Sequence, residues 1–331
     1  MTRPGSGLLV LSREDVGHLL GWDACISLMR DAMIALSAGS TRHLPRAILG
    51  LGEGRAFGVM AGGLTPGEGF GAKLISVFPN NHHKGLPSHQ GIVLLHSEES
   101  GAPVCIADAS EITRIRTASA SAAATDALAR PGPVALAILG YGHQAHAHAH
   151  AIARVREITD LRIWWRDPVK ATALAHQLAD ELGIDARPAD NVPAAVSGAD
   201  VICTTTAAAT PILHGADVKA GAHVNLVGSS RAGPAEADVD LVAGSRYIAD
   251  CRANVVVEGT ELRNAIGAGL VGEDHIAAEI GEVFNGDQPG RTSDEDITVY
   301  KSLGHVAQDI AAIRYLYERG SKSNSGTFVA L

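Results

Sequence analysis

The sequence has no cluster of basic residues, no apolar run of membrane-spanning length and only four cysteines. The net charge of -9 argues against a nucleic-acid-binding surface. We expect no transmembrane helix and no secretion signal, because the first residues lack an apolar segment followed by a small-residue cleavage site. The cysteines are far apart, so we expect reduced core residues rather than disulfides or zinc ligands. They are Cys25, Cys105, Cys203 and Cys251. These absences predict a cytoplasmic protein that binds neither nucleic acid nor membrane.

The length of 331 residues and the apolar fraction of 46% suit two domains with substantial cores. Near the N-terminus, Ser12 and Asp23 could each begin a helix. Short apolar segments then follow one another without helices, which is typical of an antiparallel or mixed sheet. We expect these strands at 47–51, 57–60, 71–78, 91–96 and 103–107. An alanine-rich helix is predicted over 110–129.

The strongest sign of a domain boundary is the Arg130-Pro131-Gly132-Pro133 segment. After it, strands and helices alternate, which predicts a doubly wound parallel sheet of the Rossmann type in an α/β fold. The last predicted helix, near 303–318, has apolar residues at helical spacing and is expected to return to the first domain. The predicted ranges are 1–129 rejoined by 305–320 for an α+β domain, 130–304 for the Rossmann domain and 321–331 for a flexible tail.

Residues 134–145 form the most informative segment, because a buried-strand pattern ends in Gly140-x-Gly142 and a helix-forming stretch follows at once. Gly140 permits a tight turn, and Gly142 lets the backbone approach a pyrophosphate. The helix then points its first amides at that anion. Ala145 replaces the third glycine of the dinucleotide fingerprint, a change that the pattern permits. We therefore expect a nicotinamide cofactor, bound by Gly140, Gly142, His143, Gln144, Ala145, Thr117 and Thr205.

The end of the second predicted strand bears on the choice of cofactor. NAD-binding sheets usually place an acid there to hold the ribose hydroxyls, whereas this chain has Trp165 followed by Arg166. A guanidinium at this point suits a 2′-phosphate, so we favour NADP over NAD. NAD remains an alternative cofactor, because the carboxylate of Asp167 could hold the ribose instead of capping the next helix.

Three cationic residues stand among apolar or small neighbours: Arg46, Lys73 and Arg116. Burying such a charge is costly unless an anion pairs with it. If the three side chains converge, they would form a carboxylate site in which an arginine supplies a bidentate clamp. The alternative is that each pairs with a nearby acid or extends its charged end into solvent.

Several segments in the same order resemble the ornithine cyclodeaminase/μ-crystallin family over nearly the whole chain. They include Gly71-Ala-Lys-Leu-Ile-Ser-Val-Phe-Pro79, Leu86-Pro-Ser-His-Gln90, Ile112-Thr-Arg-Ile-Arg-Thr-Ala-Ser-Ala-Ser121 and Glu279-Ile-Gly-Glu-Val283. The resemblance implies a homodimer whose N-terminal domain binds substrate and mediates dimerisation beside a dinucleotide-binding domain. It also implies that Arg46, Lys73 and Arg116 bind the carboxylate of an imino or amino acid.

Ser230 bears on the branch of this family. Cyclodeaminases and related alanine dehydrogenases carry an acid shortly after the strand that here ends at Val227-Gly228, and Ser230 occupies the matching position. The μ-crystallin branch, which has ketimine reductase activity, is similar to this chain there. The resemblance thus favours an NAD(P)H-dependent reductase of imino acids such as pyrroline-2-carboxylate or piperideine-2-carboxylate. An ornithine cyclodeaminase, an amino-acid dehydrogenase and a non-catalytic NADP-binding crystallin remain as alternatives.

Reduction of an imine requires its protonated form, because the carbon must accept a hydride. Lys73 could donate that proton if burial and the two arginines lower its pKa. Ser230 or His89 could hydrogen-bond the imine nitrogen.

One pair of histidines has a spacing that is also found in metal sites. His146 and His150 share a helix face, as zinc ligands can, but no acid lies near them in the sequence. We therefore expect no metal site.

Overall fold

The computed structural model describes residues 7–65 and 67–330, and the chain divides into two compact units. The first unit comprises the chain up to Arg116 together with the residues from His305 onward, and the second unit comprises Thr117–Gly304. The sequence placed the boundary at 130–133, whereas the division falls inside helix α3 (Ala109–Leu128). The reason lies in the later turns of α3, where Asn225 Nδ2 donates to Thr125 Oγ1 at 3.0 Å. Proline and glycine mark where that helix ends, not which core its residues join.

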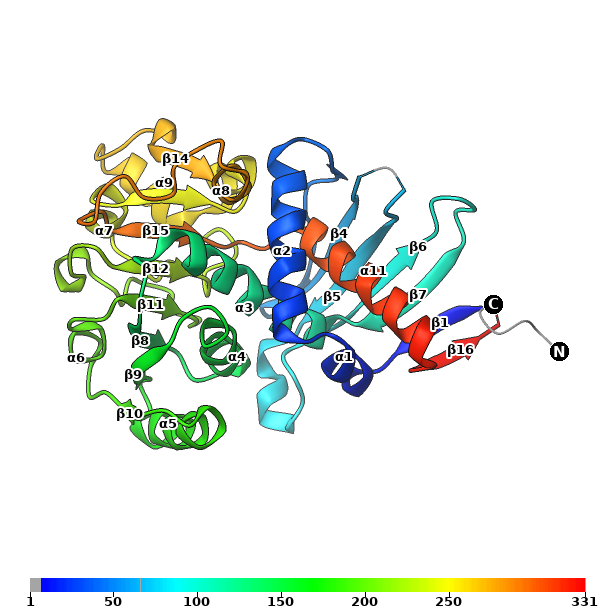
Figure 1. Ribbon diagram of the computed structural model, residues 1–331, viewed down its shortest axis with the longest axis horizontal. Coiled ribbons are helices and arrows are strands. Elements are labelled where there is room, and N and C mark those ends of the chain that lie inside the picture. The colour runs from blue at the N-terminus through cyan, green and yellow to red at the C-terminus, as the bar shows by residue number, and fades with distance from the viewer. Residues whose placement is uncertain (1–6, 66, 331) are drawn as a thin grey trace. The chain divides into compact units, whose positions relative to one another are not determined.

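The first unit is built on an eight-stranded mixed sheet in the order β16-β1-β7-β6-β5-β4-β2, with β3 also paired to β4. The strands predicted between 45 and 108 are present as β3 (Ala47–Gly52), β4 (Arg55–Gly63), β5 (Phe70–Val77), β6 (His89–His96) and β7 (Pro103–Asp108). The remaining strands are β1 (Leu8–Leu11), β2 (Arg42–His43) and β16 (Thr327–Val329). Helices α1 (Arg13–Leu19) and α2 (Trp22–Ser37) follow β1. The last helix, α11 (Val306–Ser323), packs on α2 and on β4, β5 and β6 (Figure 1). The return of this helix to the first unit places its residues over the strand that carries Lys73.

The end of the chain differs from the flexible tail predicted for 321–331. Helix α11 continues to Ser323 and ends at Asn324, whose φ of 53° is the left-handed conformation of a helix C-cap. The next residues form β16, which pairs antiparallel with β1. The Ser/Asn/Gly-rich stretch is therefore a turn that returns the chain to the sheet edge. Residue 331 lies outside the described residues.

The second unit contains an eight-stranded, all-parallel sheet in the order β10-β9-β8-β11-β12-β15-β13-β14, which confirms the predicted Rossmann-type fold. Its strands are β8 (Val134–Leu139), β9 (Ile158–Trp164), β10 (Ala186–Pro188), β11 (Val201–Thr204), β12 (His223–Leu226), β13 (Arg246–Ala249), β14 (Ile276–Glu279) and β15 (Thr298–Lys301). Its helices are α4 (His143–Ile152), α5 (Pro168–Leu182), α6 (Val192–Val196), α7 (Val239–Ala243), α8 (Arg252–Glu258), α9 (Thr260–Gly267) and α10 (Ile280–Asn285). The central strands are buried on both faces, as a parallel sheet covered by helices requires. Strands β8 and β11 are mostly apolar, whereas β12 and β15 also bury polar side chains, namely His223, Asn225, Thr298 and Lys301.

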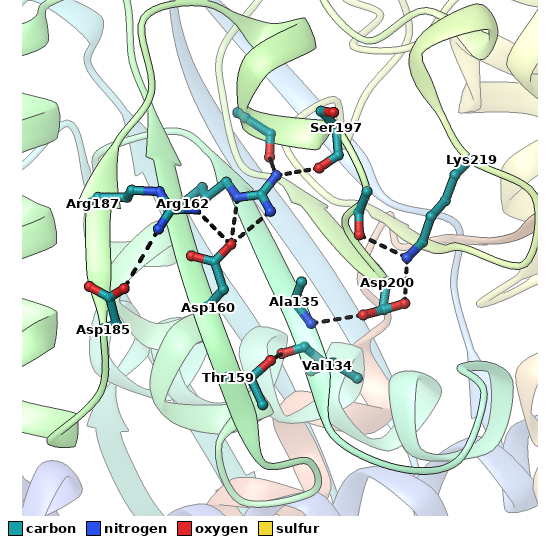
Figure 2. Close-up of polar contacts among 12 residues, drawn as sticks. Val134, Ala135, Thr159, Asp160, Arg162, Asp185, Arg187, Ser197, Asp200 and Lys219 are labelled. Atoms are coloured by element: carbon teal, nitrogen blue, oxygen red, sulfur yellow. Dashed lines mark hydrogen bonds and ion pairs between the residues drawn. The ribbon is translucent and has the colours of Figure 1, made fainter.

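The amino-terminal edge of this sheet is held by ion pairs (Figure 2). Asp200 accepts hydrogen bonds from Ala135 N at 2.9 Å and from Lys219 Nζ at 2.6 Å. Asp160 Oδ2 accepts from Arg162 Nε at 2.7 Å and from Arg187 Nη2 at 3.0 Å. Ligands of parallel α/β sheets bind at the opposite, carboxyl edge. These pairs therefore stabilise the fold, and a ligand is expected at the other edge of the sheet.

The part of the chain that the structure describes contains no helix with both the length and the apolar character needed to span a membrane.

Candidate functional site

The predicted phosphate-binding turn lies where β8 ends and α4 begins. Gly140 has a φ of 142°, and a Cβ built on it would lie 2.2 Å from Thr205 Oγ1, so no other residue fits without movement. Thr205 N in turn donates to Leu139 O at 2.8 Å, so Thr205, one of the residues predicted to bind the cofactor, lies against the turn. Gly142 is the N-cap of α4 and supplies no capping side chain. The first amides of α4 are therefore of the kind that a bound phosphate satisfies.

The other residues expected to contact a cofactor occupy different surroundings. Ala145 is fully buried, as a residue standing in for the third glycine should be, whereas His143 is exposed at the start of α4. Gln144 O lies 2.7 Å from His148 Nδ1. Thr117 is buried in α3, directly after Arg116, and is the first residue of the second unit.

Aromatic and cationic side chains gather at the carboxyl end of β9. The rings of Tyr141 and Trp165 stack with centroids 6.4 Å apart, and the Arg166 guanidinium lies 5.1 Å from the centre of the Trp165 ring. Lys170 Nζ lies 5.3 Å from the centre of the Tyr141 ring. Asp167 caps α5 and accepts from Val169 N at 3.1 Å. Asp167 therefore has the helix-capping role that was one of the two predicted for it, and Arg166 and Lys170 place two cationic side chains nearby.

Two of the three predicted carboxylate-binding cations meet in the first unit. Lys73 on β5 is 3% exposed and Arg116 on α3 is 5% exposed. Lys73 Nζ lies 3.2 Å and Arg116 Nε 3.1 Å from the same oxygen, Oδ1 of Asp309 on α11. Thr113 Oγ1 lies 2.6 Å from Lys73 Nζ, and Gln308 Oε1 accepts from Arg116 Nη1 at 2.8 Å. Both charged groups are therefore held in fixed positions.

Arg46 and His89 belong to the same electrostatic cluster. Arg46 is half-buried before β3, and its charge contributes to lowering the pKa of Lys73. Partial desolvation and then the positive charge of Lys73 lower the pKa of His89, although much of this residue is exposed. With three cations and one carboxylate, the cluster keeps an excess of positive charge that suits a second carboxylate from a ligand.

The pKa values follow from burial and charge. Burial is the main cause that lowers the pKa of Lys73 to about 8, with Arg116 and Arg46 acting in the same direction and Asp309 opposing them. Burial alone would raise the pKa of Asp309, but the charges of Arg116 and Lys73 hold it below its ordinary value. Near neutral pH, Lys73 therefore carries a proton that it can release, while Asp309 stays ionised.

Asp309 is the charged residue of this site that was not predicted from the sequence; its neutral neighbours Thr113 and Gln308 were not predicted either. Asp309 is fully buried, although it lies in a helix that was considered only for its apolar positions. The signal that singled out Lys73, a charge among apolar neighbours, was present at Asp309 as well.

Ser230 lies in the second unit, in the loop after β12, and is exposed. Buried contacts of the preceding residues, Gly228 and Ser229, hold the loop in place. Lys301 Nζ is fully buried and lies 2.6 Å from Ser229 Oγ and 2.8 Å from Glu261 Oε2. Glu236, also buried, accepts from Gly228 N at 2.7 Å. These buried acids could not be predicted from the sequence, because partners such as Thr204 of Glu236 and Lys301 of Glu261 are distant in the chain.

The histidines of α4 separate into two groups. His148 is buried, with Nε2 2.9 Å from Ser121 Oγ. His146 and His150 both contact Glu181 of α5, an acid that lies 35 and 31 residues away in the sequence and was not expected to join them. Burial opposes ionisation of Glu181, but hydrogen bonds from Gln177 and from both histidines lower its pKa to about 2.

The glycine turn on a parallel sheet and a separate unit with a buried cationic site define a two-domain protein of the dinucleotide-binding class. The profile of the ornithine cyclodeaminase/mu-crystallin family matches residues 8–324, so the chain belongs to this family. The family recognised from the sequence is thereby confirmed.

Three known proteins illustrate the similarity. A Delta(1)-pyrroline-2-carboxylate reductase of Bacillus thuringiensis subsp. konkukian is 32% identical over 321 residues, which cover 96% of this chain and 98% of the relative. The structure of the Thermococcus litoralis Delta(1)-pyrroline-2-carboxylate reductase, in complex with NADH and L-proline, superposes with a TM-score of 0.94 at 29% identity and covers 97% of this chain and 100% of that one. An archaeal alanine dehydrogenase dimer with bound NAD gives a TM-score of 0.92 at 28% identity, with coverage of 98% and 99%.

Proposed function

We propose that this protein is an NAD(P)H-dependent oxidoreductase that reduces the C=N bond of imino acids. Its substrates are cyclic ketimines such as pyrroline-2-carboxylate or piperideine-2-carboxylate, which become cyclic amino acids. The observation that carries this proposal is the pair of buried cations, Lys73 and Arg116, held on one side by Asp309. The relatives named for pyrroline-2-carboxylate reduction support the same assignment.

The chemistry divides between residues that bind the acid and one that supplies a proton. Arg116 and Arg46 bind the substrate carboxylate, Arg116 with the bidentate geometry that a guanidinium offers. This contact fixes the position of the imine carbon. Lys73 gives its proton to the imine nitrogen, and its pKa of about 8 makes that transfer accessible near neutral pH. His89 or Ser230 hydrogen-bonds the nitrogen.

Asp309 removes an electrostatic conflict in this mechanism. Three cations bind a carboxylate well, but they also repel a protonated imine. The ionised Asp309 side chain is fully buried, where a charge acts over short distances with little screening. It lowers the net charge that the iminium meets while leaving enough positive charge for the substrate carboxylate. We assign Asp309 as a positioning residue that acts through Lys73 and Arg116.

The second unit would bind the cofactor, and its residues fit that group. A Cβ at Gly140 would fill the space beside Thr205, so the turn keeps its backbone open to a pyrophosphate. A bound nicotinamide cofactor supplies the hydride. The Arg166 guanidinium and the use of Asp167 as a helix cap favour NADP, whereas structural neighbours contain NADH or NAD. We propose that both are accepted and that NADP is preferred.

We also propose that the protein is a homodimer. On β3 and just before it, Ile48 and Leu49 are 59% and 61% exposed and Leu44 is 67% exposed. An exposed apolar strand of this kind is typical of an interface, and the alanine dehydrogenase neighbour is a dimer. A cytoplasmic location is consistent with the four cysteines, all of which are buried and outside any disulfide.

Cofactor stoichiometry tests the function. With pyrroline-2-carboxylate, one NAD(P)H should be oxidised for each proline formed. With ornithine and catalytic NAD, no proline and no ammonia should appear, because an exposed serine at position 230 cannot accept and return protons as a carboxylate can. Ammonia release from ornithine would identify a cyclodeaminase instead. Absence of turnover with every imino acid, despite cofactor binding, would favour the non-catalytic alternative.

A further inference from the structure

Helices α4 and α5 bring two imidazoles and a carboxylate together on the surface of the second unit. His146 and His150 are one turn apart on α4, and Glu181 lies in the last turn of α5. The Nε2 atoms of His146 and His150 lie 2.6 and 2.7 Å, respectively, from the same oxygen, Glu181 Oε2. One ligand atom from each residue lies within 4.8 Å of the other two. The three side chains are therefore directed at a common point.

Several features of this cluster suit a metal ion. Histidines at i and i+4 present both ring nitrogens on one helix face, and here the ring centroids are 4.6 Å apart. Gln177 Nε2 donates to Glu181 Oε1 at 2.8 Å, which orients the carboxylate and leaves Oε2 toward the histidines. The side chains of His146, His150 and Glu181 are 26%, 21% and 36% exposed, so an ion can reach them.

We propose that His146, His150 and Glu181 form a binding site for a borderline divalent transition-metal ion, with Zn²⁺ as the best-suited ion. Two imidazoles and one carboxylate are a ligand set that zinc accepts, with water completing a tetrahedral shell. Ligand atoms around such an ion lie roughly 3.3 Å apart, given metal–ligand bonds of about 2.0–2.1 Å. Glu181 would therefore retreat by a fraction of an ångström, and each neutral imidazole would bind the ion through Nε2 with its proton moved to Nδ1.

The position of the site gives it a structural consequence. Helix α4 begins at the glycine turn, and α5 begins just after Arg166. An ion bound by both helices would link the two elements that follow the proposed cofactor-binding residues. We expect the ion to raise the melting temperature of the protein, because a ligand that binds only the folded state stabilises it. This inference does not depend on the proposed reductase activity.

Calorimetric titration of the tag-free protein with ZnCl₂, after treatment with a chelator, tests the site. Wild-type protein should bind one ion per chain at this site, and H146Q and E181Q should each weaken that binding at least tenfold. The matched control is H176Q, which removes an exposed histidine of α5 outside the cluster and should leave binding unchanged. Equal affinity and stoichiometry in wild type, H146Q and E181Q would overturn the proposal.

Two further measurements keep the test independent of folding defects. Melting curves in chelator show whether each variant folds, and the zinc-dependent rise in melting temperature should be present in wild type and H176Q but absent in H146Q and E181Q. Bound Co²⁺ should give the visible absorption bands typical of a four- or five-coordinate ion in wild type and H176Q, but not in H146Q or E181Q. A cluster that is only hydrogen-bonded would produce neither the rise nor the bands, and that outcome would also refute the metal site.

Discussion

Asp309→Asn tests the charge arrangement at the proposed substrate site. The carboxylate is fully buried, and its Oδ1 atom lies 3.2 Å from Lys73 Nζ and 3.1 Å from Arg116 Nε. Removing one member of a buried ion pair costs about 3–5 kcal/mol, because a charge is left without compensation. The asparagine oxygen can still accept hydrogen bonds, so we expect a loss near the lower end, about 3 kcal/mol at pH 7 in urea denaturation.

The pH dependence of this loss is more diagnostic than its size. Lys73 has an ordinary pKa of 10.5 in the unfolded chain and about 8 in the folded protein. Wild-type stability should therefore rise between these pH values, because the unfolded chain still holds a proton that the folded chain has released. In Asp309→Asn, the pKa of Lys73 should fall further, since the charge that raises it is gone. The loss in stability should shrink at high pH, where a neutral Lys73 needs no partner.

A second ion pair on the same helix provides the control. Glu318 Oε1 lies 3.2 Å from Arg314 Nε, and the Glu318 side chain is 49% exposed. Exposed pairs contribute at most about 1 kcal/mol, so Glu318→Gln should have a small effect that does not depend on pH in the same range. Similar losses of stability in the two variants, or a loss in Asp309→Asn that stays constant over about three pH units from about pH 7 upward, would show that Asp309 does not act through the charge of Lys73.

Three other substitutions test separate parts of the proposal. Arg116→Ala should remove about 2–5 kcal/mol of transition-state binding, measured as kcat/KM for an imino acid, while the Kd for NADPH changes little; wild-type kinetics would contradict its role. Arg166→Ala should raise the KM for NADPH far more than that for NADH, because a charge-assisted phosphate contact is lost; equal changes would show that Arg166 faces elsewhere. Ile48→Asp should convert a dimer into a monomer in light scattering, with Ile48→Val as the control; an unchanged mass would exclude β3 from the interface.

The second unit could be predicted from the sequence because its signals are local. The buried strand, the Gly140-x-Gly142 turn and the following helix are consecutive, so a single segment identified the dinucleotide fold. The boundary between the units could not be predicted in the same way. Helix α3 continues across it without a break, and Pro131 marks only the end of that helix. Packing, and not any local sequence pattern, determines which hydrophobic core each turn of α3 joins.

The candidate substrate site was predicted in part. Lys73 and Arg116 were found because a charge in an apolar segment requires a partner, but that partner is 236 and 193 residues away in the chain. Only the packing of α11 on the sheet brings Asp309 to them. The same limit applies to His146 and His150, whose helical spacing was visible. Glu181 joins them only because α4 and α5 lie side by side.

The pKa of Lys73 leads to a last prediction about the direction of the reaction. In imine reduction Lys73 acts as an acid, so initial rates should fall as the pH rises through about 8. In the reverse reaction, oxidation of proline by NAD(P)⁺, the neutral amine of Lys73 must accept a proton, so initial rates should rise over the same interval.

Both pH profiles should therefore share one midpoint, and Asp309→Asn should move both midpoints to lower pH. Arg116, Arg46 and His89 face Lys73 in the wild type and in this variant alike, so the shift would report the loss of the Asp309 charge. A midpoint set by the ionisation of the free imine would stay in place when Asp309 is changed. That result would remove Lys73 from the proton-transfer step, although the cations could still bind the substrate carboxylate.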